Sequence, residues 1–336
     1  MSLEWLPVAA FFLAFLSGVV FTWLSRALAL RIGFVSHPNP IVPQHTKPIA
    51  YLGGAGIVAG GAAVIVLLGY LGHLESTCWT IVRLGGCAFL YLLLGLVDDL
   101  VRLAPLPKFL VQAGLAVIAV LAATAYSFTG LWLIDMGLST LVVLILVNAF
   151  NLIDVCDGLL AGLSVIVFVA LSRTNPQFSL VALVVAGSCA GFLVFNFPPA
   201  SIFLGDAGSH VLGFLAAAMT LTGGEATEAT SYWMSLFLVL AIPLYELGFL
   251  IMIRSKKGIP WFMASPDHFS LRLQAAGLTR PQTIGVSWLA AAGFVGIAWV
   301  YSWTSIYGRL ALFALATVML ATTTVVLTRW EVDKSK

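Results

Sequence analysis

The sequence is poor in charged residues and contains few cysteines. Charged side chains make up 9% of the 336 residues, against about 25% in soluble domains, while hydrophobic side chains make up 61%. A water-soluble fold is therefore excluded. The four cysteines are scattered, with no C-x-x-C pair and no paired histidine, so neither a disulfide framework nor a structural zinc site is expected. We also expect no nucleic-acid partner, and the net charge of +2 carries little information by its sum alone.

Long apolar runs occupy most of the chain. Eleven can be read, at roughly residues 5–24, 50–71, 80–97, 109–127, 131–149, 158–171, 179–195, 209–222, 231–253, 285–304 and 308–328. The first is long enough to span a bilayer and lacks the basic start and cleavage site of a signal peptide, so it should be retained. No repeat or linker divides the chain. The sequence thus predicts an all-α polytopic membrane protein with about 10–11 transmembrane helices, in a single domain over residues 1–336.

Basic residues are distributed unevenly between the predicted loops. If the N-terminus faces outside, thirteen fall on one side of the membrane, namely Arg26, Arg31, Lys47, Arg102, Lys108, Arg254, Lys256, Lys257, Arg272, Arg280, Arg329, Lys334 and Lys336. The other side holds only Arg83, Arg173 and Arg309. The positive-inside rule then predicts that the first side, which includes the C-terminus, is cytoplasmic in the cell inner (plasma) membrane.

Acidic residues are scarce, and five of the fourteen lie in three short polar segments, each at the end of an apolar run. They are Asp98, Asp99, Asp154, Asp157 and Asp206. A carboxylate beside hydrocarbon is costly, so this clustering indicates a site. Carboxylates with amide side chains and glycines are what a divalent metal and a diphosphate require. All three segments fall on the predicted cytoplasmic side, which indicates a membrane phosphotransfer enzyme with cytoplasmic catalytic loops.

The first polar segment ends a predicted span with Asp98 and Asp99, and Lys108 follows before the next span. Adjacent side chains diverge by about 100° on a helix, so both carboxylates can serve one site only near a helix end or in a loop. One carboxylate can bind metal or lipid phosphate while Lys108 holds its neighbour. The alternative is a solvated helix end with a basic partner.

The second polar segment places oxygen-bearing side chains at a spacing of three residues, at Asn148, Asn151, Asp154 and Asp157. This spacing predicts that all four share one helical face. Gly158 allows a ligand to approach the backbone closely. A capping or loop cluster is the alternative, but the position of these side chains at a membrane boundary favours a ligand.

The third polar segment follows Pro198 and Pro199, which end the preceding span. It places Asp206 just before a helix start, with Gly205 and Gly208 beside it. Such a backbone suits phosphate and metal binding. The alternative is that Asp206 is a plain N-cap.

Together these segments resemble a known family, the polyprenyl-phosphate N-acetylhexosamine-1-phosphate transferases, or glycosyltransferase family 4. The similarity covers nearly the whole chain, and it includes His45-Thr-Lys-Pro-Ile-Ala-Tyr-Leu-Gly-Gly54, Lys108-Phe-Leu-Val-Gln112 and Ser265-Pro-Asp-His268. Ala207 is more similar to the N-acetylglucosamine-1-phosphate branch than to the phospho-MurNAc-pentapeptide transferases, which usually carry Thr there.

The resemblance implies that a membrane polyprenyl (undecaprenyl) phosphate attacks the β-phosphorus of a UDP-sugar, with Mg²⁺ or Mn²⁺, and releases UMP. The product would start a cell-envelope glycan such as lipopolysaccharide. The resemblance further implies catalytic roles for Asp98, Asp99, Lys108 and Asp206, and metal binding by Asp206 and Asp154. Substrate binding is implied for Lys47, Asn148, Asn151, Asp154, Asp157, Gly158, His268 and Arg272. The bilayer itself is a partner, and a homodimer is left open.

The sequence departs from the family pattern in the last cytoplasmic loop. Many relatives carry two or three histidines there, whereas this chain keeps His268, with Arg272 four residues later. Glu246, inside the ninth predicted span, should be paired or face a cavity. Three other functions stay open: the pentapeptide transferase step of peptidoglycan synthesis, a secondary transporter with buried carboxylates, and a non-catalytic relative.

Overall fold

The computed structural model describes residues 5–36, 48–74, 77–124, 126–223, 229–330 and 332. Strands β1 (Val35–Ser36) and β2 (Ile49–Ala50) form a small antiparallel sheet. The helices are α1 (Leu6–Ile32), α2 (Gly53–Tyr70), α3 (Cys78–Val101), α4 (Pro105–Ala119), α5 (Trp132–Ile153), α6 (Leu159–Thr174), α7 (Ser179–Asn196), α8 (Gly205–Thr222), α9 (Ala229–Val239), α10 (Ala241–Lys256), α11 (Phe269–Ala275), α12 (Arg280–Trp303) and α13 (Ile306–Thr328). The π-helical turn η3 (Val120–Thr124) extends α4, and the 3-10 turn η4 (Pro176–Phe178) precedes α7. The predicted all-α fold of a polytopic membrane protein is confirmed.

Each predicted apolar run corresponds to a helix or to a bent pair of helices. In the described part of the chain, eight helices are long and apolar enough to cross a membrane. The pair α9 and α10, bent by 77° at a short break, gives a ninth if the two helices form one span. The prediction of 10–11 spans is higher because it counted α6, which has only 16 residues, and α8, which starts with polar residues. Both complete the interior of the bundle.

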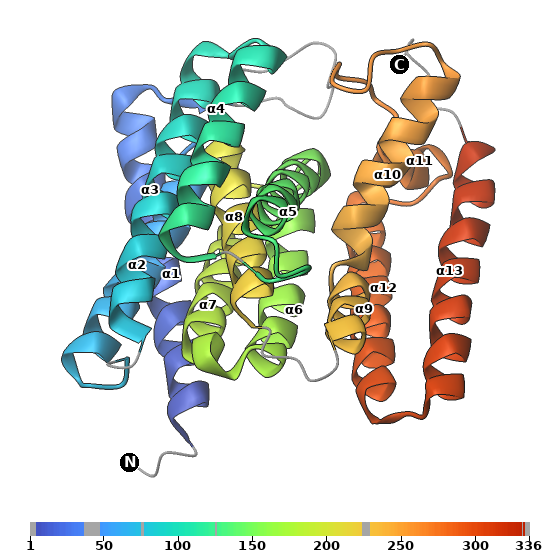
Figure 1. The fold of residues 1–336 in the computed structure, drawn as a ribbon. Coiled ribbons are helices and arrows are strands. Elements are labelled where there is room, and N and C mark those ends of the chain that lie inside the picture. The colour runs from blue at the N-terminus through green and yellow to red at the C-terminus, as the bar shows by residue number, and fades with distance from the viewer. Residues whose placement is uncertain are drawn as a thin grey trace.

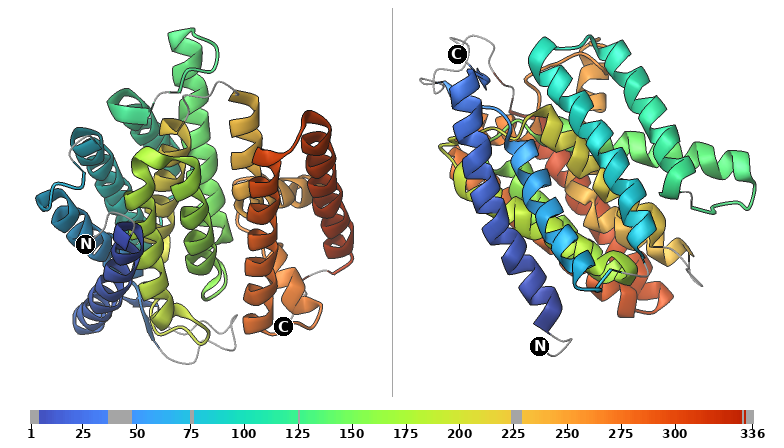
Figure 2. Two further views of the ribbon diagram at one scale, coloured as in Figure 1. Left: turned by 90° about the horizontal axis from the view of Figure 1, so that it is seen from below. Right: turned by 90° about the vertical axis from the view of Figure 1, so that its left-hand side faces the viewer.

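The helices form a bundle in which α8 lies near the centre, beside α3 and α5 (Figure 1). Helices α9 to α13 form a second group at one side, and Figure 2 shows α12 and α13 packed as its outer pair. A continuous hydrophobic core joins both groups. Helix α1 begins at the end of the bundle opposite to the one where α13 ends (Figure 1).

Helix α8 is enclosed on nearly all sides, and fifteen of its eighteen residues are buried. Two glycines on neighbouring helices allow this. A Cβ atom added at Gly54 of α2 would lie 2.3 Å from the backbone nitrogen of Gly208, and one added at Gly95 of α3 would lie 2.3 Å from Cα of Ala207. Neither position can carry a side chain without moving α8. The glycines therefore bring α2 and α3 against the first turn of α8, where the third polar segment lies.

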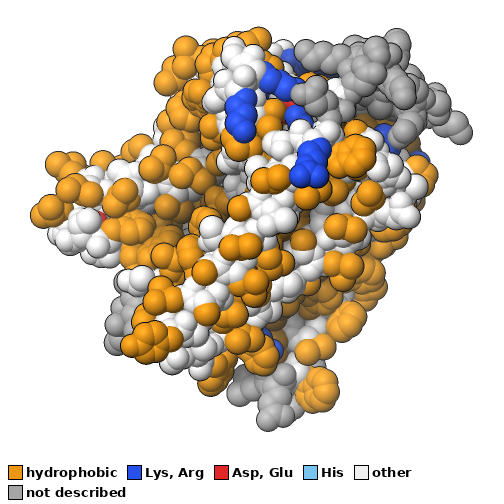
Figure 3. Space-filling model, turned by 90° about the vertical axis from the view of Figure 1, so that its right-hand side faces the viewer, with side chains coloured by type: hydrophobic (Ala, Val, Ile, Leu, Met, Phe, Trp, Pro, Cys, Tyr) orange, Lys and Arg blue, Asp and Glu red, His pale blue; other side chains and the backbone are white. Residues whose placement is uncertain are grey.

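The outer surface of the bundle is apolar. Large hydrophobic side chains such as Leu16 of α1 and Leu310 of α13 are 59% and 62% exposed. Figure 3 shows hydrophobic side chains over one flank, with Lys and Arg gathered toward the end where the C-terminus lies. A surface this apolar matches hydrocarbon and would be unfavourable in water.

Candidate active site

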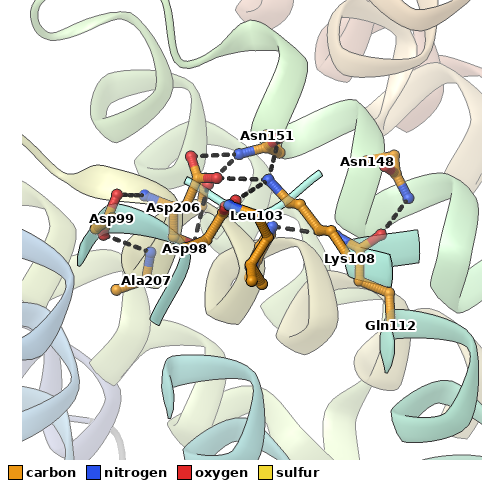
Figure 4. A network of polar contacts seen from close by, with 11 residues as sticks. Asp98, Asp99, Leu103, Lys108, Gln112, Asn148, Asn151, Asp206 and Ala207 are labelled. Atoms are coloured by element: carbon orange, nitrogen blue, oxygen red, sulfur yellow. Dashed lines mark hydrogen bonds and ion pairs between the residues drawn. The ribbon is translucent and has the colours of Figure 1, made fainter. Parts of the chain in front are cut away.

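The three polar segments meet at one end of the bundle, around Lys108 in the first turn of α4 (Figure 4). Its Nζ lies 2.6 Å from Oδ2 of Asp98 and 2.5 Å from Oδ2 of Asp206. The other oxygen of Asp206 accepts a hydrogen bond from Nδ2 of Asn151, at 2.9 Å. The predicted pairing of Lys108 with one carboxylate of the first segment is confirmed. The structure adds a second carboxylate to the same ammonium group.

Asp99 points away from Lys108 and toward α8 (Figure 4). Its carboxylate accepts hydrogen bonds from the backbone N–H groups of Asp206 and Ala207, at 2.9 and 3.2 Å. It therefore satisfies two of the four free N–H groups at the start of α8. Gly205 has φ +75°, and a Cβ atom there would lie 2.5 Å from Oδ2 of Asp99. The N-cap alternative for Asp206 is wrong, because Asp206 lies inside the helix and Asp99 caps it.

A cleft opens beside this cluster. It consists of two adjoining cavities of about 440 and 420 Å³, whose shared lining residues are Ser36, Tyr51, Asp99, Arg102 and Asp206. Asp98 lines the first cavity, and Asp154 and Asp157 line the second. All five carboxylates predicted from the three polar segments therefore line one cleft.

The second polar segment does not form a single helical face. Helix α5 ends at Ile153, so only Asn148 and Asn151 lie on it, whereas Asp154 and Asp157 lie in the turn that follows. The prediction of one shared helical face is wrong, because the chain turns before the pattern ends. The turn leads into α6 through Gly158, which has φ +76°.

The side chain of Asp154 makes no hydrogen bond or ion pair with any residue that the structure describes. Burial, together with the negative charges of Asp206 and Asp99, raises the pKa of its carboxyl well above the usual value. A cation brought into the cleft would relieve this repulsion. No group of three His, Cys, Asp or Glu side chains in the described ranges forms a complete metal site. Mg²⁺ does not need such a group of three side chains, because one or two carboxylates and the phosphates of the substrate usually hold it. The two carboxylates of Asp154 and Asp206 therefore fit that ion.

Two arginines that sequence reasoning treated only as loop charges line the cleft. Arg280, at the start of α12, donates from Nη1 to Oδ2 of Asp157 at 3.1 Å. The Arg102 side chain makes no hydrogen bond or ion pair with the described residues, which leaves it available to an anion. Its position four residues after Asp98 was the signal that could have identified it.

Asn148 lies below the cleft and not on its lining. Its Nδ2 donates to Oε1 of Gln112 at 3.2 Å, and Gln112 Nε2 lies 3.1 Å from Nε2 of His210. Gln112 and His210 are fully buried. This network links α4, α5 and α8, and the predicted substrate contact of Asn148 stays a prediction.

The last predicted cytoplasmic loop, which contains His268, is held by hydrogen bonds to α10 and α13. His268 Nδ1 lies 2.6 Å from Oε1 of Glu246, which is the partner expected for that buried carboxylate. Arg272 donates to Asp267 at 2.6 Å and to the carbonyl groups of Leu327, in the last turn of α13, and Trp330, just after it. Neither His268 nor Arg272 lines the cleft, so their predicted substrate contacts remain predictions. Lys47 lies outside the described residues.

The comparisons with known proteins agree with this geometry. The family model described as glycosyl transferase family 4 matches residues 81–224, the range that contains all five carboxylates. The chain is 30% identical over 312 residues to a probable undecaprenyl-phosphate N-acetylglucosaminyl 1-phosphate transferase of Bacillus subtilis, covering 86% of this chain and 82% of the relative.

Two further relatives come from other bacteria. A decaprenyl-phosphate N-acetylglucosaminephosphotransferase of Mycobacterium tuberculosis is 28% identical over 327 residues, covering 84% of this chain and 80% of the relative. An undecaprenyl-phosphate alpha-N-acetylglucosaminyl 1-phosphate transferase of Yersinia pestis is 29% identical over 335 residues, covering 90% and 87%. The resemblance read from the polar segments is thereby confirmed: the chain belongs to glycosyl transferase family 4.

Proposed function

We propose that this protein transfers N-acetylglucosamine 1-phosphate from its UDP-sugar to a polyprenyl phosphate in the membrane, as the first step of a cell-envelope glycan. The observation that carries the proposal is the convergence of five carboxylates from three distant segments on one cleft around Lys108. The relatives, which are named as transferases of N-acetylglucosamine phosphate that use undecaprenyl or decaprenyl phosphate, support the same reaction.

In this reaction an oxygen of the polyprenyl phosphate forms a bond to the β-phosphorus of the UDP-sugar. The bond between that phosphorus and the bridging oxygen breaks, and UMP leaves with the electron pair. Phosphoryl transfer depends mainly on positioning and charge neutralisation. The second pKa of a monoalkyl phosphate is about 6, as in phosphoserine, so the nucleophile is already largely ionised near neutral pH. No strong base is needed.

The cleft residues divide this work between them. Asp98 accepts hydrogen bonds from Lys108 and from the backbone N–H of Leu103 at 2.7 Å, so its carboxylate is held in place to orient the lipid phosphate. Lys108 and Arg102 supply positive charge for the phosphates. Asp99 keeps the start of α8, and with it Asp206, in position. Asp157 lines the cleft and is left for the nucleotide and the diphosphate, whereas Asn151 and Gly158 lie outside its lining and their substrate contacts stay predictions.

Asp206 and Asp154 would hold Mg²⁺ or Mn²⁺. The bound ion neutralises diphosphate charge in such reactions. The fit rests on the oxygen donors of these two side chains, on the raised pKa of Asp154 and on the room in the cleft.

The cleft would face the cytoplasm, where UDP-sugars are made, and the protein would work in the plasma membrane as one domain. The thirteen-to-three distribution of basic residues supports this orientation. The continuous core supports the single domain. A homodimer is not required for the cleft, because one chain supplies all of its described lining residues.

The direct test is to incubate the purified protein with polyprenyl phosphate, Mg²⁺ and a panel of UDP-sugars, and to measure UMP. We expect UMP with UDP-N-acetylglucosamine, only when the lipid phosphate is present. Turnover of only the UDP-MurNAc-pentapeptide would assign the protein to peptidoglycan synthesis. No UMP from any donor would overturn the proposed activity.

A further inference from the structure

A second large cavity lies at the opposite end of the bundle from the cleft. Its volume is about 910 Å³, and it lies between α6, α9 and α12, next to the start of α13. The cleft is built at the beginnings of α6 and α12, beside Gly158 and Arg280, whereas this cavity is lined by their last turns, with Arg173 and Trp303. At 1.5 Å per residue, α12 alone separates the two by roughly 30 Å. The two sites share no lining residue.

Two arginines line this cavity, which we call the distal cavity. Arg173 is exposed, and its side chain makes no hydrogen bond or ion pair with the described residues. Arg309 donates from Nη1 to Oγ of Ser231, and its guanidinium carbon lies 5.7 Å from the centre of the Tyr301 ring. None of the described residues that line the distal cavity is acidic. The described lining of the cavity is therefore positively charged, which suits an anion.

Basic residues are rare at this end of the protein. The sequence places only Arg83, Arg173 and Arg309 there, against thirteen basic residues at the other end. Two of these three line the distal cavity. Since membrane proteins generally avoid Lys and Arg on this side, two arginines in one cavity point to a ligand that needs them.

The remaining walls match an amphiphile. Trp299 and Trp303, in the last two turns of α12, line the cavity and are 69% and 81% exposed. Exposed tryptophans mark the headgroup level of a bilayer, so the arginines lie at about that depth. Deeper in the bundle the lining becomes apolar, with Val239, Val295 and Ala298. The cavity thus offers positive charge at headgroup depth and hydrocarbon contacts below it.

We propose that the distal cavity binds an anionic glycerophospholipid from the leaflet at that end of the protein. Arg173 and Arg309 bind the headgroup phosphate, because guanidinium groups match phosphate oxygens with paired donors. An acyl chain lies along the apolar wall. A bilayer phospholipid is favoured over the polyprenyl phosphate substrate because the reaction cleft lies at the other end of the bundle and shares no wall with this cavity.

Native mass spectrometry of the purified full chain tests this proposal. Phosphatidylglycerol and phosphatidylcholine with identical acyl chains are titrated separately, and the retained lipid is counted. We expect preferential retention of phosphatidylglycerol. Arg173→Gln should weaken that binding by about fivefold, as loss of one interfacial arginine implies, and leave phosphatidylcholine unchanged.

Arg83→Gln is the matched control, because Arg83 is a basic residue at the same end that lies outside the cavity and donates to the carbonyl of Ala122. It should retain phosphatidylglycerol like the unmodified protein. Equal retention of both lipids, or equal losses in Arg83→Gln and Arg173→Gln, overturns the proposal. Tighter, Arg173-dependent retention of undecaprenyl phosphate than of phosphatidylglycerol overturns it in favour of the carrier lipid. Turnover at the cleft should be unchanged in Arg173→Gln.

Discussion

At the scale of single residues, one ammonium group stands between two carboxylates. Lys108 contacts both Asp98 and Asp206, so these three groups carry a net charge of −1 when all are ionised. Asp99 and Asp154 line the same cleft and add further negative charge whenever their carboxyl groups are ionised. Lys108 alone does not neutralise the charge of these carboxylates. The remaining negative charge attracts a cation, and the cation in turn allows an anionic diphosphate to enter the cleft.

Asp206→Asn should remove most turnover while the protein stays folded. An amide keeps the size of the side chain, but it loses the charge that pairs with Lys108 and binds metal. The loss should reach about a hundredfold or more, since metal neutralisation of phosphate charge is worth several kcal/mol in a transition state. UMP release at saturating Mg²⁺ measures it, with a thermal melt as the folding control. Activity within about threefold of the unmodified protein would contradict the assignment.

Asp98→Asn and Asp157→Asn should differ in what they damage. Asp98 is assigned to the lipid phosphate, so its loss should lower kcat without weakening UDP-sugar binding. Asp157 is held by Arg280 beside the second cavity, so Asp157→Asn should also weaken donor binding. Arg280→Gln should weaken donor binding in the same way. The loss of binding free energy in the double variant should be smaller than the sum of the two single losses.

Donor affinity measured with and without Mg²⁺ separates these roles. If Asp98→Asn abolishes UDP-sugar binding while Asp157→Asn leaves it intact, the two assignments are reversed. Additive effects of Asp157→Asn and Arg280→Gln would mean that the ion pair does not act as one unit.

Local spacing was enough to predict how Asp98 and Asp99 diverge and that Lys108 pairs with one carboxylate near it. Local spacing could not predict contacts between residues that are far apart in the sequence and are brought together by helix packing. The bond between Lys108 and Asp206 joins residues 98 positions apart, and the ion pair of Asp157 with Arg280 joins residues 123 positions apart. Such pairs depend on which helices lie side by side, and periodicity carries no such information.

At the scale of elements, α8 decides where the catalytic groups lie. Its first turn receives a cap from Asp99 of α3, and Gly205 turns the chain into the helix with φ +75°. The apolar runs predicted the positions of the helices well. Fewer helices pass a test of length and hydropathy than there are apolar runs, because α6 is short and α8 begins with polar residues.

Gly205→Ala should therefore destabilise the protein and lower its turnover. The left-handed backbone costs a non-glycine residue about 1–2 kcal/mol, and the new Cβ would also displace the Asp99 carboxylate. Gly114→Ala in α4 is the control, because nothing lies within 4 Å of that position, and it should be neutral or slightly stabilising. Thermal melts and UMP release of both variants provide the comparison. Equal stability and activity in the two would refute the proposed constraint at Gly205.

At the scale of the whole molecule, the bundle has two chemically different ends. The carboxylates, the cleft and most basic residues lie at one end, while the distal cavity lies at the other. A secondary transporter would be expected to bind its substrate near the middle of the membrane. The position of the cleft and the family membership both favour the transferase over that alternative.

Cysteine labelling tests the proposed orientation. Ser255→Cys lies at the end of α10 near the last loop, and Tyr307→Cys lies at the start of α13, where Tyr307 is 81% exposed. In a variant without the four native cysteines, an impermeant maleimide added to intact cells should label only the second position. Labelling of only Ser255→Cys would invert the topology and separate the cleft from cytosolic UDP-sugars.

The close contact of α2 and α3 with α8 also bears on how this protein can vary. Gly54 and Gly95 touch no substrate, yet either would need to move the backbone of Ala207 or Gly208 to accept even a methyl group. In a library of all single substitutions, these two positions should tolerate as little change as the aspartates of the cleft. Intolerance to substitution will therefore identify two classes of residue in this enzyme, those that meet the substrate and those that only allow three helices to meet.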